Sequence, residues 1–253
     1  MDSAYILIVC FAFVAFIYAS VGFGGGSSYL ALLALAALPF QEIRLIALLC
    51  NIIVVLGNSL VFLQTKNLKL RKCLPLLLLS IPMAFLGARV PMHEKTYFLL
   101  IGLSLILAAV LLWFPLEKQG VSADQETRNT PVRDAIIGGL IGLLSGMIGI
   151  GGGIFLSPVL HFLKWDSSKS IAAAASLFIL ANSVAGLAGQ LVSLTIIPNW
   201  AFIGSLGIAV LIGGQFGLRY SLKNFSSTLI RKITAALVLF AGLELLWKHI
   251  FGV

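Results

Sequence analysis

The chain alternates between long apolar stretches and short polar or basic ones along its whole length. Ten apolar segments can be delimited: 4–21, 27–39, 43–64, 73–91, 96–115, 134–148, 154–164, 169–196, 200–220 and 228–250. Several reach the roughly 20 residues that an α-helix needs to cross about 30 Å of hydrocarbon. The pattern therefore predicts an all-α polytopic membrane protein.

The composition identifies lipid as the solvent for these segments. Of 253 residues, 60% are hydrophobic and only 10% are charged, whereas about a quarter of the residues in a soluble domain are charged. The net charge of +8 comes from basic residues in short bursts between apolar segments, so nucleic acid is not an expected partner. The three cysteines lie inside apolar segments without metal-site spacing, and neither a metal nor a cofactor is expected.

The sequence contains an internal repeat. The glycine cluster Gly-Phe-Gly-Gly-Gly at 22–26 reappears as Gly-Ile-Gly-Gly-Gly at 149–153. Further landmarks recur in the same order: Asn58-Ser59 and Asn182-Ser183, then a Gly-x-Arg motif that ends at Arg89 and at Arg219. We therefore predict two related transmembrane repeats, residues 1–116 and 134–253, joined by the polar linker 117–133.

In each half, a glycine cluster separates the first apolar segment from a short second one. Segments 27–39 and 154–164 are too short to cross a bilayer at 1.5 Å rise per residue. We therefore predict that each glycine cluster is the tip of a helical hairpin, followed by three full transmembrane helices in each half. The pattern leaves one alternative open, in which the two segments of each pair cross the membrane separately as two short spans.

The positions of Lys and Arg predict the orientation, because these residues are enriched in short cytoplasmic loops. When each hairpin is counted as no net crossing, most basic residues fall on the same side as the linker. We therefore predict a multi-pass protein of the bacterial inner membrane, with a cytoplasmic linker and both termini in the periplasm. Three crossings in each half make the halves point in opposite directions, which is the inverted-repeat plan of many secondary transporters.

The glycine tips are the predicted binding site for a small anion near the membrane midplane. Glycine backbone adopts positive φ and approaches a ligand closely. The short helices that begin near Ser27 and Ile154 present N–H groups and positive dipole ends, which favour anions. The predicted substrate-binding residues are Gly22, Gly24, Gly25, Gly26, Ser27, Asn51, Asn58, Ser59, Arg89, Gly149, Gly151, Gly152, Gly153, Ser176, Asn182, Ser183 and Arg219.

Simpler structural roles compete with binding at several of these positions. Asn and Ser side chains inside membrane helices also hydrogen-bond to neighbouring helices, and an arginine at a helix end also extends to the membrane surface. Glycines at GxxxG spacing permit close helix packing, and we expect only that role at Gly138, Gly142, Gly146, Gly213 and Gly217.

Acidic residues are absent from the middle of the predicted helices. Every Asp and Glu falls in a loop or near a segment end, so no buried carboxylate is expected to relay protons. The sequence contains neither the buried nucleophile and base of a hydrolase nor its metal-ligand motif. We therefore do not expect an enzyme.

The glycine motifs at 20–26 and 145–153, with the paired Asn-Ser and Gly-x-Arg motifs, resemble the TauE/SafE sulfite exporter family of membrane proteins over nearly the whole chain. The resemblance implies transport of sulfur oxyanions or organosulfonates, such as sulfite, thiosulfate and sulfoacetate, without ATP hydrolysis. The second half has Ile-Phe where the first has Ser27-Ser28, so the two hairpins need not contribute equally.

Two alternatives to an anion carrier stay open on the sequence. One is a carrier of a neutral amino acid or a cation that uses Asn and Ser side chains as ligands. The other is a non-transporting membrane scaffold subunit whose glycines only pack helices. The expected partners are a small anionic substrate and the lipid bilayer, and the sequence carries no signal for an oligomeric state.

Overall fold

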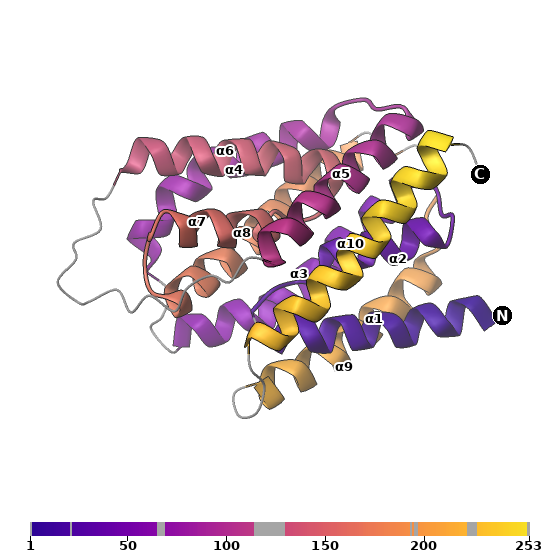
Figure 1. The fold of residues 1–253 in the computed structure, drawn as a ribbon, viewed down its shortest axis with the longest axis horizontal. Helices are drawn as coiled ribbons and strands as arrows, with labels where there is room; N and C mark the ends of the chain where they lie inside the picture. Colours follow the sequence, from indigo (N-terminus) through magenta and orange to yellow (C-terminus); the bar gives the residue numbers. More distant parts are fainter. Residues whose placement is uncertain are drawn as a thin grey trace.

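The computed structural model describes residues 2–20, 22–64, 69–113, 130–192, 194, 197–221 and 227–251. These residues form ten α-helices and no strand (Figure 1). The helices are α1 (Asp2–Ser20), α2 (Gly26–Leu35), α3 (Phe40–Gln64), α4 (Leu70–Arg89), α5 (Glu94–Trp113), α6 (Pro131–Ile148), α7 (Gly153–Phe162), α8 (Ser168–Val192), α9 (Trp200–Ser221) and α10 (Ser227–Phe251). The ten predicted segments are confirmed as helices, with ends displaced by a few residues. Most of the linker, and residue 253, lie outside the described residues.

Six helices of the described chain are long and apolar enough to cross a membrane: α3, α4, α5, α6, α8 and α9. By contrast, α2 and α7 have 10 residues each. Ten residues cover about 15 Å, or about half of the hydrocarbon thickness. These lengths fit the short second arms that the sequence predicts for the two hairpins.

Helix α6 is longer than the short first arm that the sequence predicts. Pro131 occupies the first turn, where a proline needs no backbone N–H partner, and starts the helix three residues before the apolar segment at 134. The resulting 18-residue helix meets the length of a membrane span. The second hairpin therefore combines one arm of spanning length with one arm that is too short to span.

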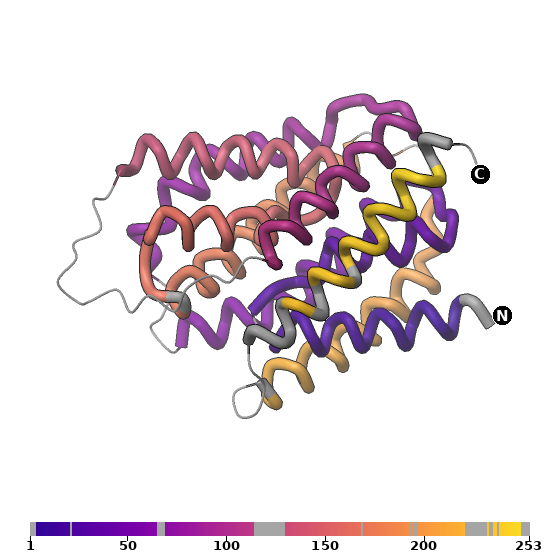
Figure 2. The backbone as a smooth tube through the Cα atoms, viewed as in Figure 1, coloured from indigo at the N-terminus to yellow at the C-terminus, as the bar shows by residue number. Residues whose placement is uncertain are grey.

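The helix pairings are exchanged between the two halves. Helix α1 packs along α9, and α6, the first helix of the second half, packs along α4, the fourth helix of the first half. The last helix of the first half, α5, packs on the last helix of the second half, α10, and α3 contacts α8. Figure 2 traces these paths along the backbone. This exchange is the pattern that a twofold relation between the halves produces, and the inversion of the halves across the membrane stays a prediction.

Glycines close the two exchanged pairings, and we call these contacts the α4–α6 seam and the α1–α9 seam. A β-carbon on Gly138, Gly142 or Gly146 would overlap the backbone of α4 at Leu76, Ser80 or Ala84. A β-carbon on Gly213 or Gly217 would overlap the backbone of α1 at Ala12 or Phe16. Glycine at these positions lets the helix backbones touch. The packing role predicted for the GxxxG glycines is confirmed.

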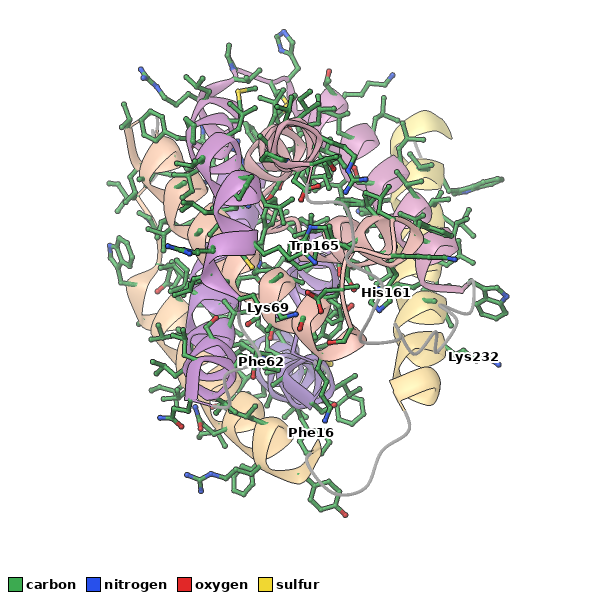
Figure 3. All side chains as sticks on the ribbon, turned by 90° about the vertical axis from the view of Figure 1, so that its left-hand side faces the viewer. Phe16, Phe62, Lys69, His161, Trp165 and Lys232 are labelled. Atoms are coloured by element: carbon green, nitrogen blue, oxygen red, sulfur yellow. The ribbon has the colours of Figure 1, made fainter. Side chains whose placement is uncertain are left out.

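The described helix ends separate into two groups at opposite ends of the molecule. In Figure 1 the start of α1, the α4–α5 turn and the end of α10 lie on the right, while the starts of α4 and α6 and the α7–α8 turn lie on the left. Figure 3 looks at the left-hand end, with Lys69, His161 and Trp165 labelled. This grouping agrees with the predicted topology; which end faces the cytoplasm stays a prediction.

An ion-pair cluster joins α4, α6 and the α7–α8 turn at that end. Asp166 pairs with Lys69 at 2.9 Å and with Lys72 at 3.0 Å. The indole Nε1 of Trp165 donates to the buried Asp134 carboxylate at 2.8 Å, and the Lys72 ammonium lies 4.5 Å from the Trp165 ring centroid. Partial burial alone would raise the pKa of Asp166, but hydrogen bonds from Lys69, the Ser167 N–H and Lys72 lower it to about 2.

Candidate substrate-binding site

The two glycine clusters form turns that only glycine adopts without strain, and we call residues 22–26 the first tip and 149–153 the second tip. Positive φ angles occur at Gly22 and Gly25 in the first tip, and at Gly149, Gly151 and Gly152 in the second. Each tip ends at a left-handed N-cap, which is Gly25 for α2 and Gly152 for α7, and neither helix has a side-chain cap. The first-turn N–H groups of both helices therefore lie at the tips without a side-chain acceptor.

Asn51, in the middle of α3, lies between the two tips. Its Nδ2 donates to the Ile150 carbonyl of the second tip at 3.0 Å. A β-carbon on Gly24 would overlap Asn51 Oδ1, and one on Gly26 would overlap Asn51 Nδ2 and lie 2.6 Å from the Ile150 oxygen. The missing β-carbons therefore let one buried amide touch both halves of the molecule.

Several polar side chains of α3 and α8 are buried and in part unpaired. Ser183 Oγ would lie 3.0 Å from a β-carbon on Gly151, and Asn58 Nδ2 donates to the Phe23 carbonyl at 3.4 Å. The buried side-chain atoms without a hydrogen-bond partner include Asn51 Oδ1, Asn58 Oδ1, Asn182 Oδ1 and Nδ2, and Ser183 Oγ. Because most buried polar groups in proteins are hydrogen-bonded, such a set is suited to recognise a polar solute.

The structure brings some of the predicted site residues together and leaves others apart. Gly24, Gly26, Gly151 and Ser183 gather around Asn51, and we call these five residues, with the Ile150 carbonyl, the junction. Of the remaining predicted residues, Asn58 contacts the first tip as described, and Ser59 and Ser176 hydrogen-bond to each other at 3.1 Å.

Several predicted residues point away from the junction. A β-carbon on Gly25 would meet the Tyr29 ring at 2.9 Å, and one on Gly152 would meet Phe178 at 2.9 Å, so these glycines face aromatic side chains outside the junction. Other predicted residues have neighbours of their own: Ser27 beside Tyr18, Gly22 beside Phe62, Gly149 beside Arg44 and Gly153 beside Ile179. Arg89 and Arg219 are exposed near the ends of α4 and α9.

The neighbours of the glycines correct one pairing made from the sequence. On its own side of the molecule, Gly24 of the first tip faces Asn51 of α3, and the equivalent Gly151 of the second tip faces Ile179 of α8, in addition to the contact of Gly151 with Asn51 across the junction. Asn51 and Ile179 are 128 positions apart, but Asn58 and Asn182 are only 124 apart, a difference of about one helical turn. Asn58 and Asn182 are therefore not structural counterparts, and the junction has its buried amide on one side only.

Sequence reasoning missed Arg44 as a site residue, and the charge count only placed it among the few basic residues on the side opposite the linker. Arg44 is buried in the second turn of α3 with 4% of its surface exposed. Its Nη2 donates to the carbonyls of Ala88 at 3.0 Å and Gly146 at 2.9 Å, and its guanidinium lies 5.9 Å from the ring centroid of Tyr97. A sequence signal did exist, because Arg44, Asn51 and Asn58 recur every seven residues and therefore share one face of α3.

Comparisons with known proteins cover nearly the whole chain. Residues 7–245 match the model of the family described as "Sulfite exporter TauE/SafE". The chain is 32% identical over 242 residues to "Probable membrane transporter protein y4hK" of Sinorhizobium fredii (strain NBRC 101917 / NGR234), with 95% of this chain and 97% of that protein covered. No solved structure matches the chain. The matched residues include both tips, the junction and both seams.

Proposed function

The chain belongs to the TauE/SafE sulfite exporter family, and on this premise we propose that it carries a sulfur oxyanion or an organosulfonate across the membrane. Family membership makes it a membrane transporter and not an enzyme, as the sequence motifs indicated. The proposed substrate class is that of sulfite, thiosulfate and sulfoacetate. The observation that supports an anion is the junction, where two uncapped helix N-termini and a buried amide converge.

The electrostatics of the junction favour negative charge. Each helix N-terminus carries the equivalent of about half a positive charge, and α2 and α7 both begin at the tips. In the described part of the chain, the only buried acidic side chain is Asp134, at the opposite end of α6 from the second tip. An oxyanion would therefore find N–H donors and amide groups at the junction without a carboxylate beside them.

Transport requires the junction to open toward each side of the membrane in turn. The Asn51–Ile150 hydrogen bond joins α3 of the first half to the second tip, so relative movement of the halves breaks or remakes it. We assign proton coupling, where it occurs, to the substrate, because sulfite itself titrates near neutral pH. Substitution of any single Asp or Glu should then leave the pH dependence of the flux intact.

Thermal unfolding of the purified protein with a panel of solutes tests the proposed substrate class. A ligand that binds only the folded protein stabilises it by about 2.7 kcal/mol at 100 times its Kd. Sulfite, thiosulfate and sulfoacetate should raise the unfolding temperature, and neutral amino acids and simple cations should not. Stabilisation by amino acids or cations alone would contradict the proposal, and stabilisation by none of these solutes would favour a scaffold role.

An Asn51→Ala variant locates the site within the same screen. Its unfolding temperature in buffer should fall moderately, and the added stabilisation by the anion should disappear. Gln64→Ala, an exposed position at the end of the same helix, is the matched control and should keep the full anion response. An Asn51→Ala protein that still responds fully to the anion would show that binding lies elsewhere.

A further inference from the structure

We propose that Arg44 is a second anion-binding position on the substrate path, next to the junction, and that its charge makes the transporter select anions over neutral solutes. The inference rests on the proposed function and extends it, because Arg44 lies outside the junction and adds a fixed positive charge to the path. The binding group is the guanidinium, and the ligand class is an oxyanion.

The position of Arg44 on α3 connects it to the junction. Arg44, Asn51 and Asn58 are all buried, with 4%, 0% and 0% of their surfaces exposed. Seven residues of α-helix advance about 10.5 Å and complete almost two turns, so the three side chains form a stripe along one face of α3. The stripe passes both tips, since Asn58 contacts Phe23 and Asn51 contacts Ile150.

The charge of Arg44 has no acidic partner among the described residues. Salt bridges in that part of the chain involve only Asp134 and Asp166, which pair with other cations at the far end of α6 and in the α7–α8 turn. Arg44 instead contacts two carbonyls near the C-termini of α4 and α6, and its Nε is buried without a partner. A buried charge needs compensation by an opposite charge or by hydrogen bonds, and an oxyanion beside the guanidinium would supply both.

The first tip has no arginine at the corresponding position. An added β-carbon on Gly149 of the second tip would lie 3.3 Å from Arg44, whereas one on the equivalent Gly22 of the first tip would meet Phe62 at 3.0 Å and Ala172 of α8 at 3.8 Å. The carbonyls that Arg44 contacts lie on α4 and α6, and their counterparts α9 and α1 pack together with alanine at the corresponding position. Helix capping alone therefore does not account for a buried guanidinium at one tip only.

Arg44 is also connected to the tip that the substrate must contact. It bonds to Gly146 in the last turn of α6, just before the second tip. Tyr97 stacks near the guanidinium and donates its hydroxyl to the Ile148 carbonyl at 3.0 Å. An anion held by Arg44 would therefore lie next to the backbone that carries Gly149 and Ile150.

The test compares Arg44→Gln with Arg44→Lys, using thiosulfate binding to the purified full-length protein by calorimetric titration. Both variants lose the guanidinium Nη2 that donates to the Ala88 and Gly146 carbonyls, so both should unfold at a lower temperature by a similar amount. Arg44→Gln also loses the charge and should bind thiosulfate at least about tenfold more weakly. Arg44→Lys should stay within about threefold of the unaltered protein at pH 7. Arg71→Gln, an exposed arginine near the start of α4, is the control for nonspecific charge effects.

A pH series on Arg44→Lys gives a readout that a structural role would not change. Arginine stays protonated at every practical pH, but a buried lysine loses its proton at alkaline pH. Thiosulfate keeps its charge throughout this range. Its affinity for Arg44→Lys should therefore fall at least about tenfold between pH 7 and pH 10, while the unaltered protein shows a flat profile. A flat profile in the lysine variant would overturn the proposal even where Arg44→Gln does not fold.

The outcomes separate this inference from the proposed function. Equal affinities in Arg44→Gln and the unaltered protein, together with a loss in Asn51→Ala, would refute a binding role for Arg44 and leave the anion transporter standing. Equal affinity losses in Arg44→Gln and Arg44→Lys at pH 7 would make Arg44 a structural anchor. Failure of the unaltered protein to bind thiosulfate, sulfite or sulfoacetate would instead refute the proposed function.

Discussion

The tips and the seams are both rich in glycine, but glycine has a different purpose in each. At the tips the backbone takes positive φ angles, and the missing side chains make room for the Asn51 amide. In the seams the glycines lie inside regular helices, and the missing side chains let one backbone touch another. A side chain added in a seam should therefore change stability, and one added at the junction should change binding.

The two regions also differ in how far their surroundings can adjust. Next to Gly24 the obstacle is the end of the Asn51 side chain, which rotates at moderate cost. Next to Gly146 the obstacle is the carbonyl oxygen of Ala84 inside α4, which moves only with its helix. The largest predicted loss of stability is therefore in the α4–α6 seam.

The largest effect is expected for Gly142→Val. Its side chain would overlap the Ser80 carbonyl and push α6 away from α4, and overpacking of this kind costs at least about 1–3 kcal/mol. The variant should give little folded protein after extraction, and the fraction that survives should bind the anion with unchanged affinity. Fluorescence-detected size-exclusion chromatography measures the yield, and calorimetric titration measures the affinity.

Gly204→Ala is the control for the seam substitution. Gly204 lies inside α9, is exposed and has no atom within 4 Å of an added β-carbon. Replacing this helical glycine with alanine should leave stability unchanged or raise it by up to about 1 kcal/mol. Equal losses at positions 142 and 204 would mean that any helical substitution is harmful, and the distinction between seam and surface would fail.

The second effect is expected for Gly24→Ala, which tests the junction. Position 24 does not have a positive φ angle, so alanine introduces crowding against Asn51 without backbone strain. The affinity for sulfite or thiosulfate should fall at least about tenfold, or about 1.4 kcal/mol, with folded yield largely retained. Unchanged affinity, measured by titration, would remove the junction from the substrate path.

Gly25→Val and Gly152→Val are less specific tests of the tips than the glycine motifs suggested. The φ angle is 88° at Gly25 and 82° at Gly152, and the added side chains would press on Tyr29 and Phe178. Both variants should still lose anion affinity by at least about tenfold. Because backbone strain of about 1–3 kcal/mol accompanies the loss, their unfolding temperatures should also fall, unlike that of Gly24→Ala.

The ten helices were predictable because membrane helices appear in a sequence as long apolar runs. The tips were predictable because consecutive glycines interrupt those runs. Sequence reasoning failed for Arg44, since a charge near the start of an apolar segment is usually at the membrane surface, and only the fold shows its burial. It also paired Asn58 with Asn182, because matching sequence motifs do not fix which turns of two helices face the tips. The neighbours of Gly24 and Gly151 supply that register.

The third effect is expected for Asp166→Asn, which acts at the end of the α4–α6 seam where both helices begin. The pKa of the Asp166 carboxyl in the folded protein is lowered to about 2, below the ordinary value of about 3.9. The ionised carboxylate therefore stabilises the fold above about pH 4. This contribution disappears as the pH falls toward 2. At pH 7 the variant should therefore be less stable by about 1 kcal/mol, with unchanged anion affinity. Thermal unfolding should show this difference shrinking between pH 4 and pH 2. A constant difference across that range would contradict the assigned ion pairs.

The smallest perturbation, single cysteines at the two ends of the molecule, decides whether the tips enter from opposite faces. Lys95 lies exposed at the start of α5, and Lys164 lies exposed in the α7–α8 turn. In a background with Cys10, Cys50 and Cys73 replaced, neither Lys95→Cys nor Lys164→Cys should change stability or affinity, because neither lysine forms an ion pair in the described part of the chain. A membrane-impermeant maleimide added to intact cells should label position 95 and spare position 164 until the membrane is permeabilised, because basic residues are retained in the cytoplasm.

Labelling of 164 alone would reverse the predicted orientation but keep the tips on opposite faces. Labelling of both positions from outside would place the α4–α5 and α7–α8 turns on one face, and the two hairpins could then not enter from opposite sides.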